Sequence, residues 1–117
     1  MQRNYDRIRQ IHRNRIIKSH DEVLDDYADM TGHSRSEINQ VALERGSDLF
    51  SDSHATDLMI TIMNIYLNQL AVFLQNHGEN VTYEQLINGY EPRIQFSVIE
   101  HIWSPHVDDI SYSFKII

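Results

Sequence analysis

Basic side chains are concentrated at the start of the chain, where their chemistry suits binding to a polyanion. Six of the ten Lys and Arg residues lie within residues 1–18: Arg3, Arg7, Arg9, Arg13, Arg15 and Lys18. After residue 18, four basic residues stand against sixteen acidic ones, and the whole chain has a net charge of −7. The field at a surface depends on local charge, so this segment can steer the chain onto phosphates. The alternative is a solvated basic segment without a partner.

Two other sets of polar side chains have the residue types that metal binding or acid–base chemistry requires. Seven histidines are scattered along the chain, and the C-terminal ones (His77, His101 and His106) lack a tight ligand spacing, so no metal site or other cofactor is expected. The carboxylates at 21, 22, 25, 26 and 29 follow one another on the outer face of a predicted helix without a convergent partner, which predicts a solvated face. No phosphate loop, dinucleotide glycine pattern or nucleophile motif is present, so an enzyme is not expected.

The length and composition fit one compact domain, or a small domain with an appendage. The chain has 117 residues, of which 41% are hydrophobic, enough to form a core. It has no cysteine, which excludes disulfides and thiolate metal sites and is consistent with a cytoplasmic protein. The N-terminus is polar and lacks the apolar core of a signal peptide.

A helix, a glycine turn and a second helix are predicted between residues 19 and 46. Thr31-Gly32 ends the first helix, because glycine accepts a left-handed backbone without steric cost. Ser34 and Glu37 have the spacing of a capping box, which begins the second helix. That helix has an apolar stripe, formed by Ile38, Val41 and Ala42.

The segment Thr31-Gly32-His33-Ser34-Arg35-Ser36-Glu37-Ile38, followed by Ala42-Leu43, resembles the second-helix entry of ribbon-helix-helix proteins, the MetJ/Arc type of DNA-binding dimer. The resemblance covers residues from about 8 to 50. It implies that two chains pair one short strand each into an antiparallel ribbon, which enters the major groove of double-stranded DNA. It also implies a phosphate clamp at the second helix, on Ser34, Arg35 and Ser36.

The position of the ribbon strand depends on where the first helix begins. A capping box at Ser19 and Glu22 would place the strand at 14–18, whereas a helix beginning near Asn14 would move it back to about 7–13. We favour a strand within 7–15. The expected DNA contacts in this segment are Arg9, Arg13 and Arg15, then Asn14, with Arg7 and Lys18 beside them.

An ordinary helix-turn-helix is the competing interpretation of the same helices. Ala28, Gly32, Ile38 and Val41 have the spacing of that motif as well. The motif usually has apolar residues on both sides of the glycine, where this chain has Thr31 and His33. An α-hairpin with a capped second helix and no DNA role is the third interpretation.

A strongly apolar helix is predicted from Leu58 to Leu74, where thirteen of seventeen residues are apolar. It is too short and too interrupted to span a membrane, which needs roughly 20 apolar residues. Because so small a chain has little protein to cover it, we expect burial between subunits, in a homodimer that assembles further to a homotetramer. The expected oligomerisation residues are Leu58, Ile62, Ile65, Tyr66, Leu70 and Phe73.

The remaining residues predict a short capped helix after Thr82 and two strands. Ile94, Phe96 and Val98 alternate with polar residues, as do Ile110, Tyr112, Phe114 and Ile116. The expected fold is therefore α+β and mainly α. It consists of a ribbon-helix-helix domain over residues 1–50, followed at 51–117 by an oligomerisation module of a long helix, a short helix and a β-hairpin.

The resemblance implies a sequence-specific transcriptional regulator, a repressor that binds operator repeats as a dimer of dimers. The alternative is an accessory protein of a plasmid conjugation relaxosome, which binds the transfer origin and recruits a relaxase. An antitoxin would have a toxin-binding tail that is disordered until bound, and the dense apolar helix disfavours this. A purely structural oligomer would show no salt-sensitive DNA binding.

Overall fold

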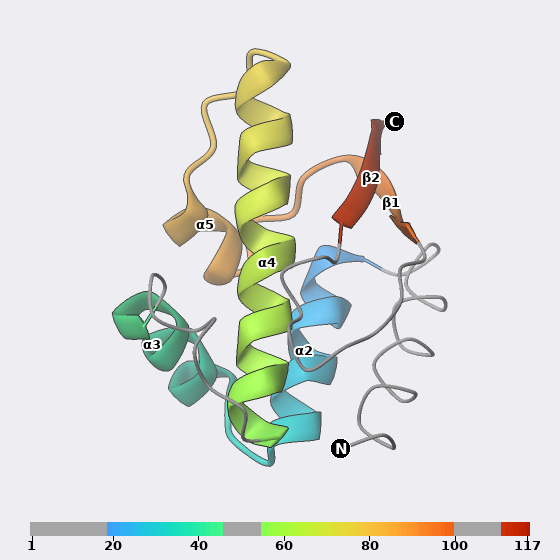
Figure 1. Cartoon of the computed structure of the whole chain (residues 1–117). Coiled ribbons are helices and arrows are strands. Elements are labelled where there is room, and N and C mark those ends of the chain that lie inside the picture. Colours follow the sequence, from blue (N-terminus) through green and yellow to red (C-terminus); the bar gives the residue numbers. More distant parts are fainter. Residues whose placement is uncertain (1–18, 46–54, 100–110) are drawn as a thin grey trace.

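The longest helix, α4 (Ala55–Asn76), is the element around which the others pack (Figure 1). The computed structural model describes residues 19–45, 55–99 and 111–117. In chain order the other elements are α2 (His20–Thr31), α3 (Arg35–Arg45), α5 (Tyr83–Ile87), β1 (Ile94–Ile99) and β2 (Ser111–Ile116). Helices α2, α3 and α5 and strand β2 all contact α4.

The apolar side chains of α4 are buried by the chain's own elements. Ile62, Tyr66 and Leu70 are fully buried, Ile65 is nearly so, and Phe73 packs against the core with part of its ring exposed. The chain's own elements α2, α3, α5 and the hairpin cover these residues, so their apolar character does not by itself require a second subunit, and the association of subunits stays a prediction. The side chain of Leu58 lies outside the described residues.

Helices α2 and α3 are joined by a turn that the local sequence dictates. Ser19 and Glu22 form a reciprocal capping box at the start of α2, and Gly32 ends the helix with φ +73°. Ser34 and Glu37 form the second capping box, with Ser34 N donating to Glu37 Oε1 at 3.0 Å. The predicted helix–glycine–helix unit is confirmed, and the first helix begins at the later of its two predicted positions.

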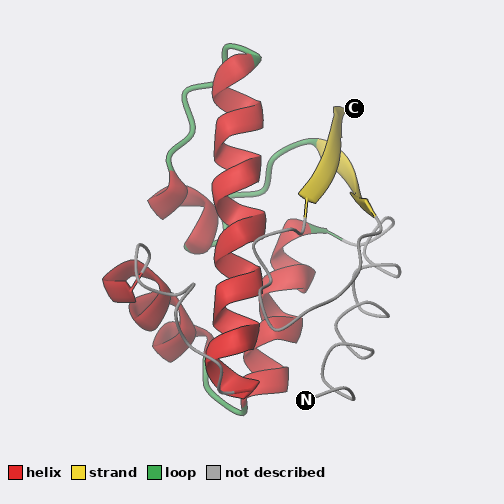
Figure 2. Cartoon of the chain, viewed as in Figure 1, coloured by secondary structure: helices red, strands yellow, loops and turns green. Residues whose placement is uncertain are grey.

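A short helix and a two-stranded sheet complete the described chain (Figure 2). Thr82 and Gln85 cap α5, and β1 pairs antiparallel with β2 in a register that places Phe96 opposite Phe114. Tyr66 of α4 packs against Phe96 and Tyr112, with ring centroids 5.1 and 5.2 Å apart. Alternation in each strand turns one face toward α4, as the sequence predicts.

The coarse fold prediction is confirmed: the described chain is α+β, mostly helical, with one antiparallel hairpin. One hydrophobic cluster joins residues of α2 and α3 to residues of α4, α5 and the hairpin, so both predicted parts of the chain contribute to the same core. The predicted ribbon strand at 7–15 lies outside the described residues. None of the described helices has the length and apolarity that crossing a membrane requires.

Candidate nucleic-acid interface

Helix α3 has one face in the core and one face directed to solvent. Ile38 and Ala42 are buried, and Val41 packs beside them. The other face borders an open groove of about 620 Å³, lined by Arg35, Ser36, Asn39, Gln40, Leu43, Glu44 and Asn88. Most of these side chains can donate or accept hydrogen bonds, whereas Leu43 adds an exposed apolar side chain, so the exposed side of α3 is polar in most of its residue types but mixed in character.

Two amide side chains occupy the middle of this α3 groove. Gln40 Nε2 donates to Glu44 Oε1 at 3.0 Å, which orients the Gln40 amide along the helix. Asn39 is half-buried, and its Oδ1 has no hydrogen-bond partner in the described structure. A buried acceptor without a donor is uncommon in folded proteins.

The N-terminus of α3 is capped by its own side chains. Glu37 N donates to Ser34 Oγ at 3.3 Å, so this hydroxyl already serves the helix end. The hydrogen bonds from Ser34 lower the pKa of the exposed Glu37 carboxyl, with a smaller contribution from His33. Ser36 is exposed. The predicted phosphate-clamp residues Ser34 and Ser36 are therefore adjacent at the surface, but Ser34 is engaged in capping.

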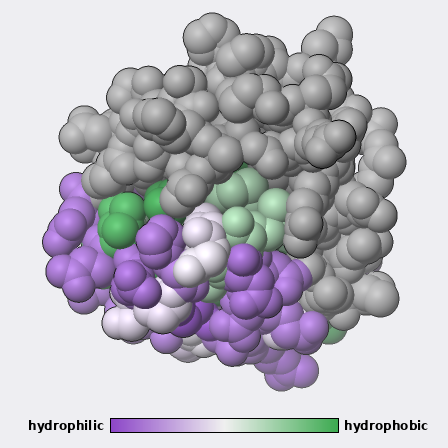
Figure 3. Space-filling view, turned by 90° about the horizontal axis from the view of Figure 1, so that it is seen from below, coloured by the Kyte–Doolittle hydropathy of each residue, from purple (hydrophilic) through white to green (hydrophobic). Residues whose placement is uncertain are grey.

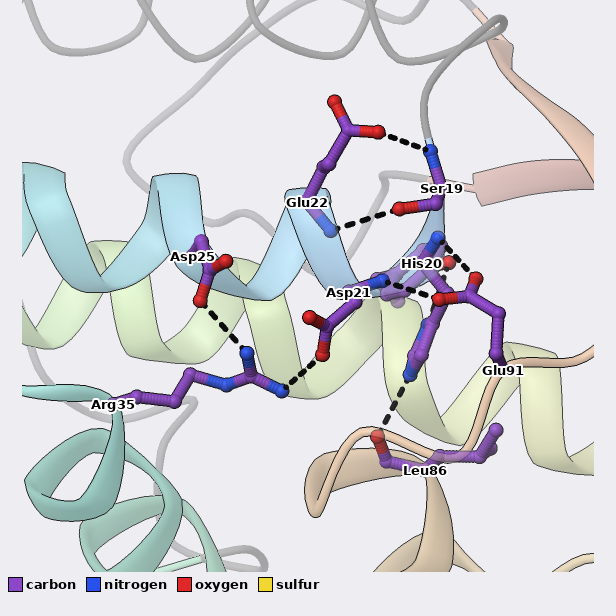
Figure 4. Close-up of polar contacts among 9 residues, drawn as sticks. Ser19, His20, Asp21, Glu22, Asp25, Arg35, Leu86 and Glu91 are labelled. Atoms are coloured by element: carbon purple, nitrogen blue, oxygen red, sulfur yellow. Dashed lines mark hydrogen bonds and ion pairs between the residues drawn. The ribbon is translucent and has the colours of Figure 1, made fainter.

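Arg35, the third residue of the predicted clamp, is bound by carboxylates of the preceding helix (Figure 4). Its Nη1 lies 2.7 Å from Asp25 Oδ1, and its Nη2 lies 3.0 Å from Asp21 Oδ1. The expectation that the α2 carboxylates form only a solvated face without a convergent partner is thus wrong for these two residues. They converge on a cation of the next helix.

A set of polar contacts at the start of α2 was not predicted from the sequence. We call it the polar interlock, and it consists of His20, Asp21, Tyr66, Leu86 and Glu91. The Glu91 carboxylate accepts from the backbone N–H groups of His20 and Asp21, at 2.8 and 3.2 Å. His20 Nε2 lies 2.7 Å from the Leu86 carbonyl, and His20 Nδ1 lies 3.0 Å from the Tyr66 hydroxyl. The contacts join α2, α4, α5 and the segment after α5, and Figure 4 shows those of Leu86 and Glu91.

The interlock determines the protonation of its histidine. A carbonyl oxygen can only accept, so Nε2 carries the proton and donates to Leu86. Burial raises the pKa of Tyr66 well above its ordinary value, which keeps its hydroxyl protonated and able to donate to Nδ1. Burial is also the main cause that lowers the pKa of His20, outweighing the opposing effects of the Leu86 carbonyl and the Glu91 carboxylate. His20 is therefore a neutral structural residue.

The predicted base-contacting residues lie in the part of the chain that the structure does not describe: Arg7, Arg9, Arg13, Asn14, Arg15 and Lys18. On the side of the molecule where the α2–α3 turn lies, the described residues are mostly hydrophilic (Figure 3). Exposed acidic residues dominate the outer face of α2.

A second groove, with a volume of about 440 Å³, lies between α4 and β2. Its lining combines the apolar side chains of Val72, Phe73 and Phe114 with the amide side chains of Asn68, Gln69 and Asn76 and with Tyr112. Val72 is 57% exposed. Of the predicted oligomerisation residues, only Phe73 borders this groove.

Across residues 19–45, 55–99 and 111–117, no three His, Asp or Glu side chains come together in a way that could hold a metal ion. His101 and His106 lie outside these ranges. No protein-family model, curated protein or solved structure matches the chain.

Proposed function

We propose that this chain is a sequence-specific DNA-binding transcriptional regulator in which α2, the Gly32 turn and α3 form the unit that reads DNA. The supporting observation is the two-faced character of α3. Its apolar side is fixed in the core by Ile38 and Ala42, while its other side presents Ser36, Asn39 and Gln40 to an open groove. A rigidly held helix with an exposed polar face is what insertion into a major groove requires.

The residue types on this face match the edges of DNA bases. The amides of Asn39 and Gln40 suit the N6 and N7 atoms of adenine, which offer one donor and one acceptor. Ser36 accommodates either a base or a phosphate.

The basic segment at residues 3–18 supplies the non-specific part of the affinity in this proposal. The six cations of this segment adjoin α2 in the sequence, whereas the rest of the chain is acidic. Contacts to phosphates position a protein on the duplex, and base contacts then give specificity. Repression follows from occupancy of an operator that overlaps the start of transcription.

Two docking modes are compatible with this function. In the helix-turn-helix mode α3 reads the bases, and the core positions of Ala28, Ile38 and Val41 favour it. In the ribbon-helix-helix mode a strand within 7–18 reads the bases, and α3 holds a phosphate beside it. We favour the first mode because it uses the groove on α3.

The test is selection of about 30-base-pair duplexes from a random pool by the full chain, followed by titration of the selected duplex. We expect enrichment of a defined sequence. Gln40→Ala should then weaken binding to that sequence by about 1–3 kcal/mol and leave binding to unrelated duplexes unchanged. Gln95→Ala is the matched control, because Gln95 is exposed on the hairpin, away from α3.

The same titration separates the two docking modes. Loss of sequence preference in Arg13→Ala but not in Gln40→Ala would show that the ribbon mode is correct. A pool that yields no enriched duplex, together with no binding to any duplex at low salt, would refute the DNA-binding proposal.

A further inference from the structure

Arg35 is the cation best placed to contact a DNA phosphate beside α3, and in the free chain it is already neutralised. It is the first residue of α3 and lines the α3 groove. Two separate carboxylates, Asp21 and Asp25, accept from the two terminal nitrogens of its guanidinium. Together they occupy the two terminal nitrogens of the guanidinium, which could otherwise donate to two oxygens of one phosphate.

The segment that follows α5 packs against this ion pair and keeps it in place. Gly89 has φ +95°, and a Cβ atom at this position would lie 3.0 Å from Asp21 Oδ1 and 3.3 Å from Arg35 Nη2. Glu91, two residues later, binds the backbone N–H of Asp21. Both contacts fix the Asp21 carboxylate toward Arg35, whose side chain is only 25% exposed.

We propose that Asp21 and Asp25 act as an internal competitor for DNA phosphate, withholding Arg35 from non-cognate DNA. This inference rests on the proposed function. A phosphate must displace at least one carboxylate before Arg35 can bind it, and the displaced carboxylate then lies beside the duplex. Only a duplex that also satisfies the base-reading face of α3 compensates for this cost. The displacement cost is subtracted from the binding free energy of every complex in which Arg35 holds a phosphate, so the carboxylate pair lowers the general affinity for DNA.

The competition predicts that removing a carboxylate from Arg35 strengthens DNA binding. With a labelled mixed-sequence duplex of about 30 base pairs as the probe, Asp25→Asn should raise affinity about fivefold, because one surface ion pair no longer competes with the phosphate and one repulsive charge is removed. The matched control is Asp29→Asn. It removes the same charge one turn further along α2, from an exposed position, and should change affinity less than about twofold.

A double-mutant cycle isolates the contribution of Arg35. In an Arg35→Gln background, Asp25→Asn should give no more gain than Asp29→Asn, because the cation that the carboxylate withholds is gone. Equal gains for Asp25→Asn and Asp29→Asn in the wild-type background would overturn the proposal. A gain from Asp25→Asn that persists undiminished with Arg35→Gln would do so as well.

The design also separates this inference from the proposed function. Thermal unfolding of each variant establishes that it is folded, and Asp25→Ala with Asp29→Ala gives a second pair in which the acceptor is removed altogether. If the wild type binds the probe and the cycle shows no coupling between Asp25 and Arg35, the proposed competition is wrong, but the DNA-binding proposal is not contradicted. If neither the wild type nor any Asp25 variant binds the probe or a selected duplex, both are wrong.

Discussion

His20 is the residue whose ionisation controls the interlock between α2, α4 and the segment after α5. The ring is buried between a carbonyl, to which Nε2–H donates, and a tyrosine hydroxyl, from which Nδ1 of the neutral ring accepts. The charged groups nearest to it oppose one another: Glu91 and Asp21 favour the cation, and Arg35 disfavours it. Desolvation outweighs these effects, so the pKa of His20 lies below its ordinary value of 6.5.

We therefore expect the chain to lose stability in mild acid. A histidine whose pKa is lower in the folded state binds fewer protons than it does in the unfolded chain. Its stabilising contribution is complete above pH 6.5 and is lost as the pH falls from there through the lowered pKa. Urea unfolding at a series of pH values measures this loss. His20→Asn should be less stable at neutral pH and should lack this part of the pH dependence.

The exposed His77 provides the control for that measurement. His77→Asn should keep the wild-type dependence on pH. A His20→Asn variant whose stability falls between neutral and mildly acidic pH as steeply as that of the wild type would contradict the assignment.

Gly89 is a second residue with a specific requirement, because its backbone is left-handed and its α carbon faces the Asp21–Arg35 ion pair. Gly89→Ala should lower the free energy of unfolding by about 1–3 kcal/mol, through backbone strain and displacement of the carboxylate. Gly78→Ala, also at positive φ but with nothing within 4 Å of the new methyl group, should cost less. Denaturant titrations measure the free energy of unfolding of the two variants. Equal decreases would show that the close approach at Gly89 is unimportant.

At the scale of elements, the local features were predictable and the distant ones were not. The capping boxes at Ser19, Ser34 and Thr82 form as the three-residue spacing predicts, because each depends on neighbouring residues alone. The hairpin follows in the same way from alternation. Glu91 caps α2 from 70 residues away, and no local pattern marks a carboxylate for that role.

The same difference between near and distant contacts explains why neither the partner of the α2 carboxylates nor the cover of α4 was predicted from the sequence. Sequence spacing shows that the α2 carboxylates share a face, but the direction of the next helix decides whether Arg35 reaches them. Likewise, the apolar character of α4 was evident, but the elements that cover it are distant in sequence. Amphipathic patterns reveal which faces must be buried and do not reveal which elements bury them.

The burial of α4 changes what a polar substitution there should do. Leu70→Asp places an unpaired carboxylate in the core of one chain, so it should unfold the protein rather than separate subunits. Leu70→Ala should lower the free energy of unfolding by about 2–5 kcal/mol. Val72→Asp, at an exposed position on the same helix, should stay within about 0.5 kcal/mol of wild type.

Circular dichroism with light scattering distinguishes these outcomes. A folded Leu70→Asp variant of reduced molecular mass would restore the original expectation that this part of α4 joins subunits. A reduced mass in Val72→Asp alone would instead place a subunit contact at the groove between α4 and β2.

At the scale of the whole molecule, the distribution of charge is the feature most closely linked to function. An acidic chain is repelled by DNA unless its cations are grouped, and here six of ten are grouped within residues 1–18. In our proposal this segment contributes general affinity and α3 contributes selectivity. The carboxylates that hold Arg35 limit the general affinity.

The most direct test of DNA binding is a titration of the full chain against a duplex selected from a random pool, repeated at several salt concentrations. We predict that the logarithm of the affinity falls linearly with the logarithm of salt, with a slope of about −0.9 for each phosphate neutralised. If the six cations of residues 1–18 make the phosphate contacts, replacing Arg13 and Arg15 with alanine removes two of these contacts. The slope should then become shallower by nearly twice the contribution of one phosphate. An affinity that does not depend on salt, or no binding at the lowest salt, would contradict the proposed function.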